Sequence, residues 1–444
     1  MSGWLVHLDN HTLGHADAAA DAVRARGLRT AAIGPAAELA TLGQVERMIP
    51  LERCDEAAVE AALATLEAEA PIRGIRCMFG LPEGGGRTPR SLAMLAAEAR
   101  ARRGLPGSAA AALDAANVKS LTRETLDRAG IASVAHRVVR SGTEAAQFAE
   151  ARFAATGGGA IVLKPLTGVG AGFVRRCEGG AEARAAFDET VPLLADAYHR
   201  PTRNPPFVAR AAWGDVRVDP LSSLLAEDYI EGPEISVECV VVGTRALPLV
   251  VNDKLALETT RWTVREPLLV TPPMRLDRAQ TAAARDYAVR VIEALGLSDC
   301  VCHVELRVDP ERGPLLLEIN PRIGAGCVRD SLATFWGVDP IAVDIDLALG
   351  RVPRMSAFER TGRTHAMIFA FTDRKGILRG IDGLDAMMRQ PGVLCARQMT
   401  ENGAAVDGRH EEQFILGVWR RLTDGQTPQA AYRQTLGSLH VDII

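Results

Sequence analysis

The segment from Val301 to Gly326, VCHVELRVDPERGPLLLEINPRIGAG, constrains the fold more than any other part of the chain. Two runs of alternating polarity flank residues 309–314, whose Asp, Pro and Gly residues are typical of a hairpin loop. Pairing the runs so that Glu305 lies opposite Glu318 gives two distinct faces, and a shift of one residue would mix them. The apolar face then carries Val304, Leu306, Val308, Leu315, Leu317 and Ile319. The other face carries His303, Glu305, Arg307, Leu316, Glu318 and Asn320.

This pairing places two carboxylates directly across from each other, which destabilises a strand pair. At an effective dielectric constant of about 20 and a separation of about 4 Å, the repulsion is on the order of 4 kcal/mol. A hard divalent cation would remove this cost, and the two carboxylates with the amide oxygen of Asn320 suit Mg²⁺. The alternative is that both glutamates simply face water. We favour the metal because Asn320, Arg322 and two glycines follow at once.

The 444 residues are too many for one hydrophobic core and predict two or three domains. With 47% hydrophobic and 24% charged residues, the composition is that of a soluble protein. The net charge of −4 lacks the basic excess that nucleic-acid binding needs. No apolar run approaches the roughly 18 residues that span a bilayer. The first ten residues, MSGWLVHLDN, lack the basic start of a secretion signal, so we expect neither a membrane nor a nucleic-acid partner.

The eight cysteines include no C-x-x-C pair, so neither a zinc site nor a disulfide framework is predicted, and a cytoplasmic location fits. His7, His11 and His15 are spaced by four, but we expect them on a strand, a loop and a helix start, without a metal. Among 51 basic residues only four are lysines, namely Lys119, Lys164, Lys254 and Lys375. Where arginine is used almost everywhere, a lysine can mark a place that needs a compact ammonium group.

Residues 1–105 alternate between strand-like and helical runs. Strands are expected at residues 4–8, 29–33 and 74–79, and helices at residues 16–26, 51–69 and 91–103. This order predicts an open, mostly parallel α/β sheet. Gly84-Gly85-Gly86 follows a strand and could cradle a ligand or form a flexible turn. No G-x-G-x-x-G follows the first strand, so no dinucleotide site is predicted.

A glycine-rich turn follows a buried strand expected at residues 161–165. The strand ends near Lys164, and the turn contains Gly168, Gly170 and Gly172. Small residues let backbone N–H groups approach an anion closely. A glycine-rich hairpin alone is usually only a turn, but beside the lysine it indicates a phosphate clamp.

Residues 227–238, EDYIEGPEISVE, are expected to form a strand, a tight turn and another strand. The turn could be purely structural. Its spacing, however, exposes backbone groups near Tyr229 and Ile230 and a carboxylate at Glu234. Recognition of an adenine edge and a ribose diol requires such groups.

Helices are also expected on both sides of Lys119. Four motifs together resemble those of the ATP-grasp superfamily in order and in rough spacing: Lys119, Lys164 with the glycine-rich turn, E-D-Y-I-E-G-P-E, and V-E-L…L-E-I-N-P-R. Residues 106–350 carry the motifs, with a lid subdomain at about 132–230. Residues 1–105 resemble the nucleotide-fold-like domain that precedes the grasp in many members. Residues 351–444 resemble the small C-terminal subdomain of the amino-acid ligase branch. The resemblance therefore implies an α/β protein in which a nucleotide-fold-like domain is followed by an α+β grasp.

The resemblance implies a nucleotide site. Lys119 and Lys164 would reach the phosphates of ATP, beneath a lid formed by Gly168, Gly170 and Gly172. The adenine would be held largely through the backbone of Glu227, Tyr229 and Ile230, and the ribose by Glu234.

It also implies the metal and catalytic groups. Glu305, Glu318 and Asn320 would bind Mg²⁺, with Mn²⁺ as an alternative ion. Arg322 would stabilise the phosphoryl group in transit, together with Lys164. Gly324 and Gly326 would keep the backbone close to the substrate.

In this superfamily a carboxylate attacks the γ-phosphate of ATP, and an amine then displaces the phosphate, so the protein mainly positions and neutralises charge. We therefore expect an ADP-forming ligase that joins a carboxylate, such as an amino acid, to an amine through an acyl phosphate, giving an amide or dipeptide. Residues 252–273 lie where dipeptide-forming ligases place substrate contacts. The candidates there are Lys254, Glu258, Arg261, Trp262 and Arg265, each of which could equally lie on an exposed hairpin edge. His303 could contact substrate or make a structural hydrogen bond.

Two other functions stay open. One is a biotin-carboxylase type of enzyme with bicarbonate as the acid, although the chain lacks an M-K-M biotin-acceptor signature. The other is a non-catalytic nucleotide-binding module, which conflicts with the complete set of metal and phosphate groups. The expected partners are ATP and a small acid and amine of unidentified structure, and a homodimer is not ruled out by the sequence.

Overall fold

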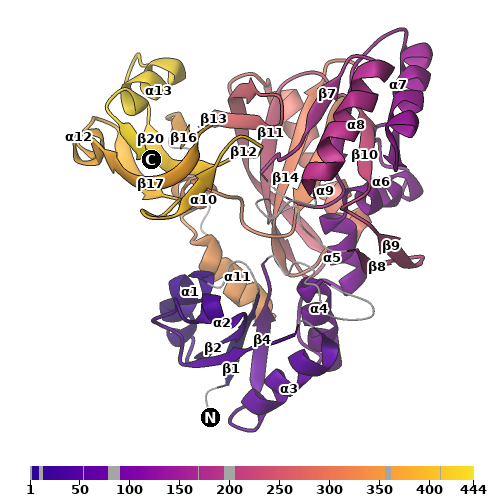
Figure 1. Ribbon diagram of the computed structural model, residues 1–444. Coiled ribbons are helices and arrows are strands. Elements are labelled where there is room, and N and C mark those ends of the chain that lie inside the picture. Colours follow the sequence, from indigo (N-terminus) through magenta and orange to yellow (C-terminus); the bar gives the residue numbers. More distant parts are fainter. Residues whose placement is uncertain are drawn as a thin grey trace.

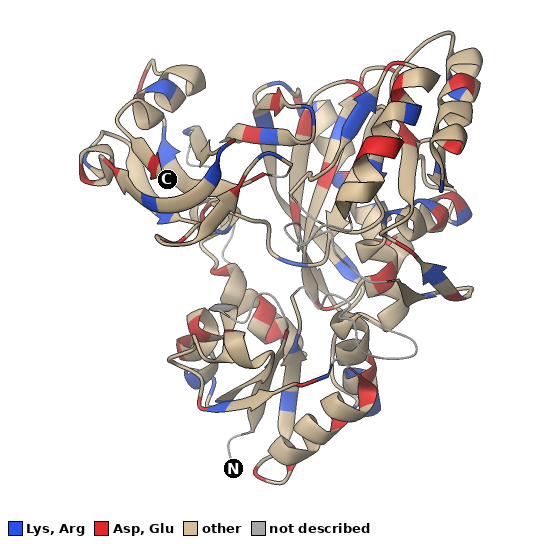
Figure 2. Cartoon of the chain, viewed as in Figure 1, with Lys and Arg blue, Asp and Glu red and all other residues tan. Residues whose placement is uncertain are grey.

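The computed structural model describes residues 3–9, 14–53, 55–78, 91–168, 170–194, 206–355, 362–410 and 412–444. His11 and the predicted turn Gly84-Gly85-Gly86 lie outside these ranges. Figure 1 shows an α/β unit at the bottom that contains the N-terminus, a larger unit above it, and C-terminal strands at the upper left. In Figure 2, basic and acidic segments are interspersed over all three parts. Within the described ranges, no helix is long and apolar enough to cross a membrane.

The N-terminal unit is a four-stranded parallel sheet in the order β3-β2-β1-β4, which confirms the predicted α/β sheet. Its strands are β1 (Trp4–Leu8), β2 (Arg29–Gly34), β3 (Arg47–Pro50) and β4 (Ile72–Arg76). Its helices are α1 (Gly14–Arg24), α2 (Ala36–Leu39), α3 (Glu56–Glu67) and α4 (Leu92–Arg102). The sequence pattern does not predict β3, because this edge strand is largely exposed. Helix α3 begins at Glu56, later than expected, because the Asp55 side chain caps the amide of Ala58.

The lid is an antiparallel sheet in the order β5-β10-β6-β7, covered by two helices. Its strands are β5 (His136–Val139), β6 (Ile161–Pro165), β7 (Arg175–Cys177) and β10 (Leu224–Asp228), and its helices are α7 (Gly142–Thr156) and α8 (Gly180–Leu194). The helices α5 (Ala110–Asn117) and α6 (Lys119–Arg128) lead into it, as expected, and the hairpin β8 (Phe207–Ala211) with β9 (Gly214–Val218) packs on α5. The glycine-rich turn joins β6 to β7, which pair with each other.

An eight-stranded antiparallel sheet forms the centre of the upper unit, in the order β15-β14-β11-β12-β13-β16-β20-β18. These strands are β11 (Glu234–Val242), β12 (Arg245–Thr259), β13 (Val264–Thr271), β14 (Cys300–Asp309), β15 (Gly313–Asn320), β16 (His365–Phe371), β18 (Val393–Gln398) and β20 (Phe414–Arg421). The other C-terminal strands are β17 (Lys375–Asp382), β19 (Ala405–Asp407) and β21 (His440–Ile443). The helices are α9 (Arg278–Leu295), α10 (Val328–Trp336), α11 (Pro340–Ala348), α12 (Leu384–Met388) and α13 (Pro428–Leu436).

Helix α11 joins the upper unit to the N-terminal sheet, beside α1 in Figure 1. Arg26 donates to both carboxylate oxygens of Asp346, at 2.6 and 2.7 Å. Arg76, buried at the end of β4, forms an ion pair with Asp344, with its Nε 2.6 Å from Oδ2. These two ion pairs fix the position of α11 against the N-terminal unit.

The predicted pairing of the hairpin is confirmed at the site, where Glu305 lies opposite Glu318 and His303 opposite Asn320. Beyond Glu305, however, a β-bulge shifts the register, so Leu306 pairs with Leu316. The predicted faces are therefore wrong for the leucines of β15. Leu316 is fully buried in the main core, whereas Leu315 and Leu317 lie on the opposite side, beside Ile230.

The segment 227–238 forms a strand, a turn and another strand, as predicted. Its two strands, β10 and β11, belong to different sheets, so the turn between them joins the lid to the central sheet. Strands β12 and β13 are interior strands of the eight-stranded sheet. The alternative of an exposed hairpin edge is therefore wrong for Lys254, which is 1% exposed, but it fits Glu258 and Arg261 at the exposed end of the hairpin.

Candidate functional site

A cavity of about 450 Å³ lies between the lid, the hairpin β14–β15 and the C-terminal strands β16 and β20. The predicted residues that line it are Lys119, Lys164, Gly168, Gly170, Gly172, Glu227, Tyr229, Ile230, Glu234, His303, Glu305, Glu318, Asn320 and Arg322. The tentative candidates that do not line it are Lys254, Trp262, Arg265, Gly324 and Gly326. The structure thus gathers residues from widely separated parts of the chain around one space.

Two lysines lie at the phosphate end predicted from the sequence. Lys164 Nζ lies 2.7 Å from Glu227 Oε2 and donates to the carbonyl of Leu317 at 3.2 Å. Lys119 Nζ donates to the carbonyl of Gly168 at 3.0 Å and lies 3.2 Å from Glu318 Oε2. Burial lowers the pKa of Lys164.

Glu227 is held by a residue that sequence reasoning missed. Arg123 donates its Nε to Glu227 Oε1 at 2.7 Å, and both side chains are buried. Burial alone would raise the pKa of Glu227, but Arg123 and Lys164 outweigh it and lower the pKa to about 2. The side chain of Glu227 is therefore fully engaged by cations, and its backbone lies in β10 between its partner strands β5 and β6. A signal existed, because Arg123 follows Lys119 by one helical turn on α6.

The proposed metal ligands face the cavity from β14 and β15. Glu305 accepts from Lys254 at 3.0 Å and from His303 Nε2 at 3.1 Å. Asn320 Oδ1 accepts from Arg322 at 3.2 Å. Two carboxylates and an amide oxygen are the donor set that Mg²⁺ prefers, so the residues present fit this ion.

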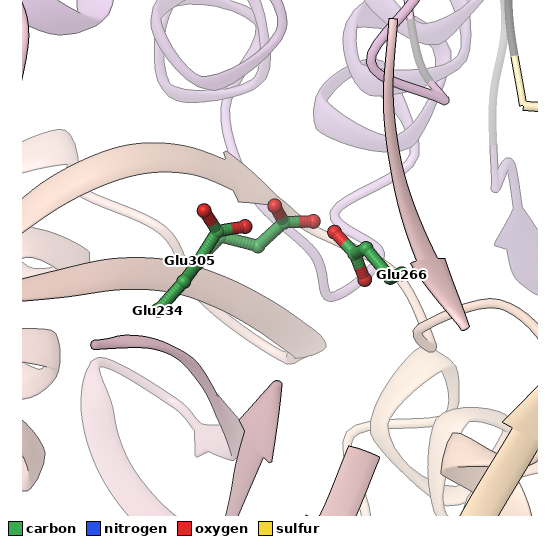
Figure 3. Close-up of side chains that lie close together, drawn as sticks. All are labelled: Glu234, Glu266 and Glu305. Atoms are coloured by element: carbon green, nitrogen blue, oxygen red, sulfur yellow. The ribbon is translucent and has the colours of Figure 1, made fainter. Parts of the chain in front are cut away.

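Lys254 contacts all three members of a second carboxylate cluster, and Figure 3 shows these three glutamates. The carboxylates of Glu234, Glu266 and Glu305 converge, with oxygen atoms that all lie within 4.8 Å of one another. The ammonium of Lys254 donates to Glu234 at 2.8 Å and also hydrogen-bonds to Glu266 and Glu305. Because a lysine ammonium already binds all three carboxylates, we assign no metal to this cluster. These carboxylates raise the pKa of Lys254 well above its usual value, against the effect of burial.

Glu234, predicted to hold a ribose, is bound on both sides in this structure. Its Oε2 accepts from Arg307 Nε at 2.9 Å, and Oε1 accepts from Lys254. Arg307 also donates to the carbonyl of Ile230 at 2.9 Å, so it fixes the turn between lid and central sheet.

Two acidic residues of the cavity, Glu266 and Glu412, were not predicted. Glu412 Oε1 accepts from the amide of Glu266 at 3.0 Å. Burial and the neighbouring Glu266 raise the pKa of Glu412 well above its usual value. Burial likewise raises the pKa of Glu266 to about 7, although Lys254 opposes this. Glu412 lies in the loop before β20, and nothing in its local sequence marks it as part of a site.

Trp262 and Arg265 do not line the cavity. Trp262 lies between Phe173 of the lid and His410, and Arg265 contacts the C-terminal segment. The rings of Phe173 and His410 stack at 5.5 Å between centroids, and Trp262 meets His410 edge-on at 5.2 Å. Phe173 donates its amide to the carbonyl of His410 at 3.1 Å. Arg265 donates to the carbonyl of Gly408 at 2.9 Å. We refer to Phe173, Trp262 and His410 as the aromatic clamp.

His303 is held between Glu238 and Glu305. Its Nδ1 lies 2.8 Å from Glu238 Oε1, and Glu238, also missed from the sequence, is fully buried. Burial disfavours the imidazolium, but the two carboxylates outweigh it and raise the pKa of His303 to about 10. A Cβ on Gly324 would lie 2.7 Å from His303 Nδ1, so this glycine brings the backbone close to the histidine.

Gly326 makes a similar close approach to an aromatic ring. A Cβ there would lie 2.4 Å from Phe369 Cε1, and its φ of +64° favours glycine. Gly324 and Gly326 therefore allow close packing near the cavity, but neither residue lines it.

Comparisons with known proteins agree with this arrangement. Residues 159–330 match the family model described as an ATP-grasp domain. Carnosine synthase 1 of Gallus gallus is 30% identical over 405 residues, which are 89% of this chain and 40% of that protein. Alanine–anticapsin ligase of Bacillus amyloliquefaciens is 25% identical over 256 residues, 56% of this chain and 50% of that protein. The chain thus spans half or less of the length of these curated relatives.

The fold itself matches over the whole chain. The crystal structure of the L-amino acid ligase from Bacillus licheniformis superposes with a TM-score of 0.75 at 20% identity, covering 100% of this chain and 99% of that one. Residues 159–330 therefore match an ATP-grasp domain, and the whole chain has the fold of the L-amino acid ligase.

Proposed function

We propose that this chain is an ATP-dependent ligase that activates a carboxylate as an acyl phosphate and transfers the acyl group to an amine, with ADP and phosphate as products. The observation that carries the proposal is the composition of one cavity. It brings the lysines Lys119 and Lys164 together with the carboxylates of Glu305 and Glu318 and the guanidinium of Arg322.

The groups are arranged by charge along the cavity. Lys119 and Lys164 lie beside the glycine-rich turn and suit phosphate oxygens. Glu305, Glu318 and Asn320 would hold Mg²⁺, which when bound would neutralise phosphate charge. Arg322, whose side chain donates to Asn320, lies next to these ligands and suits the charge that develops on a phosphoryl group in transfer.

The other end of the nucleotide would occupy the junction of the lid and the central sheet. Ile230 and Leu317 give an apolar wall there, while Tyr229 and Glu234 lie beside Arg307. The roles of Glu227, Tyr229 and Ile230 toward adenine and of Glu234 toward ribose are part of this proposal.

Hydroxylamine tests the proposal, because it intercepts an acyl phosphate as a hydroxamate without the natural amine. The protein with ATP and Mg²⁺ is screened against L-amino acids, small monocarboxylates and bicarbonate. We expect ADP, phosphate and hydroxamate with at least one organic acid. ADP formation with bicarbonate alone would favour the biotin-carboxylase type, and nucleotide binding with no acid-dependent hydrolysis would favour a binding module.

A further inference from the structure

The end of the cavity that faces the C-terminal strands has a chemistry different from the phosphate end. Its apolar wall consists of Leu269, Val328, Met367, Phe369 and Phe414. The rings of Phe369 and Phe414 meet edge-to-face at 5.3 Å between centroids. Phe369 is held in place, because it packs against Gly326 and lies close to Gly417. This wall suits an apolar substituent rather than a phosphate.

Glu412 lines the same cavity, two residues before Phe414 in the chain. The carboxylates around Lys254 each have a cationic partner, and Glu238 has His303. Among the described residues, by contrast, the carboxyl of Glu412 accepts a hydrogen bond only from the amide of Glu266. Burial and Glu266 raise its pKa, and Lys254 opposes this only in part.

The position of Glu412 is fixed by the lid. Its own amide donates to the carbonyl of Gly170 at 3.2 Å, and the stacked rings of Phe173 and His410 lie next to this contact in the chain. Two backbone hydrogen bonds to the lid, from Glu412 to Gly170 and from Phe173 to His410, therefore hold the loop before β20 where Glu412 lines the cavity. A carboxyl held rigidly beside an apolar wall, without a cation of its own, suits a ligand that supplies the cation.

We propose that Glu412 and the wall of Phe369 and Phe414 form the amine subsite, and that the second substrate enters it as an ammonium ion with an apolar substituent. This assignment rests on the proposed ligase function, in which the amine must meet an acyl group near Arg322. It makes Glu412 a specificity-determining residue: an amine whose substituent bears a carboxylate would place a like charge against Glu412 and is rejected.

Binding measurements test the subsite without turnover. Phenethylamine, which is a cation at neutral pH, is titrated calorimetrically into the full chain with MgADP, and 2-phenylethanol serves as its neutral counterpart. We expect the amine to bind at least tenfold more tightly than the alcohol, since a hydrogen bond between two charged groups is stronger than one between neutral groups. Equal affinities for the two would overturn the proposal.

The variant Glu412→Gln keeps the size of the side chain and an oxygen that can accept from the Glu266 amide. We expect it to bind phenethylamine at least tenfold more weakly and 2-phenylethanol as before. The matched control is Glu401→Gln, an exposed glutamate in the preceding turn, which should change neither. A second variant, Phe414→Leu, should weaken phenethylamine but not methylamine. Unchanged binding of phenethylamine by both site variants would refute the subsite.

The binding measurements and the acid screen can fail separately. Hydroxamate formation in the acid screen tests the ligase reaction and does not need the amine subsite. Failure of the screen with charge-selective amine binding intact would refute the reaction but not the subsite. Hydroxamate formation without charge-selective binding would refute the subsite but not the reaction.

Discussion

Glu305 and Glu318 lie directly opposite each other in β14 and β15, yet their carboxylates contact different lysines: Lys254 lies 3.0 Å from Glu305 and Lys119 lies 3.2 Å from Glu318. The repulsion expected from the sequence is therefore already offset by ammonium groups. A metal ion bound by Glu305 and Glu318 would therefore bind carboxylates that already have lysine partners, not two unpaired carboxylates. Three of the four lysines thus contact carboxylates of the site, in agreement with the argument from lysine scarcity.

Glu318→Gln should leave the protein folded but lower turnover by about a hundredfold or more, the scale for loss of one preorganised charged group. The exposed Glu311 at the tip of the same hairpin provides the control Glu311→Gln, which should be fully active. The measurement is acid-dependent ADP release, with thermal unfolding as the check on folding. Normal turnover in Glu318→Gln would remove Glu318 from the metal site.

Arg123→Met should destabilise the protein by about 3–5 kcal/mol, because it leaves the buried Glu227 with one cation in place of two. The double variant Arg123→Met/Glu227→Gln should recover much of this loss, since it also removes the buried charge. Urea unfolding of the two variants and the unchanged protein checks this. Additive losses in the double variant would show that the pair does not interact energetically.

The order of elements and the outline of the site were predictable because both depend on local sequence. Strand polarity gave the pairing of Glu305 with Glu318, and the spacing of glycines marked the turn between β6 and β7. The limits of the domains, at residues 105 and 350, stay a prediction. The β-bulge after Glu305 was not predictable, because a run of three leucines does not show which one is the extra residue.

The residues that were missed act through long-range contacts. Glu412 reaches the cavity from a loop 146 residues beyond its partner Glu266, and no local pattern encodes that approach. Trp262 and Arg265 were assigned to substrate because of their position in the chain. Trp262 instead packs between the lid and His410, and Arg265 bonds to the carbonyl of Gly408. Contacts between separate sheets depend on the tertiary arrangement, which polarity patterns do not specify.

Asp114 gives the stability a distinct pH dependence. It is 1% exposed, and burial raises its pKa to about 6 from a usual value of 3.8. Because the folded state holds this proton more tightly than the unfolded state, stability should fall as the pH rises from about 4 to 6. Asp114→Asn removes this loss, so its stability relative to the unchanged protein should rise by about 3 kcal/mol over that range and then stay constant. A difference that does not vary with pH would contradict the buried, protonated carboxyl.

Trp262→Leu should loosen the aromatic clamp, because aromatic pairs are worth about 0.5–1.5 kcal/mol each. We expect faster amide hydrogen exchange at Phe173 and weaker retention of an ATP analogue by up to about tenfold. In the unchanged protein, the same analogue should slow exchange of the glycine-rich turn. Equal, strong protection with and without the analogue would show that the lid does not respond to nucleotide.

Product analysis of the complete reaction tests the central claim most directly. The protein is supplied with ATP, Mg²⁺, the acid found in the hydroxylamine screen and an apolar amine, and the nucleotide products are separated. In the proposed reaction Lys164, the carboxylate pair and Arg322 would meet the terminal phosphates, so ADP and phosphate should form in equal amounts with the amide. Arg322→Ala should slow this reaction by about a hundredfold or more with little change in nucleotide affinity. AMP and pyrophosphate as the main products would contradict the acyl-phosphate route.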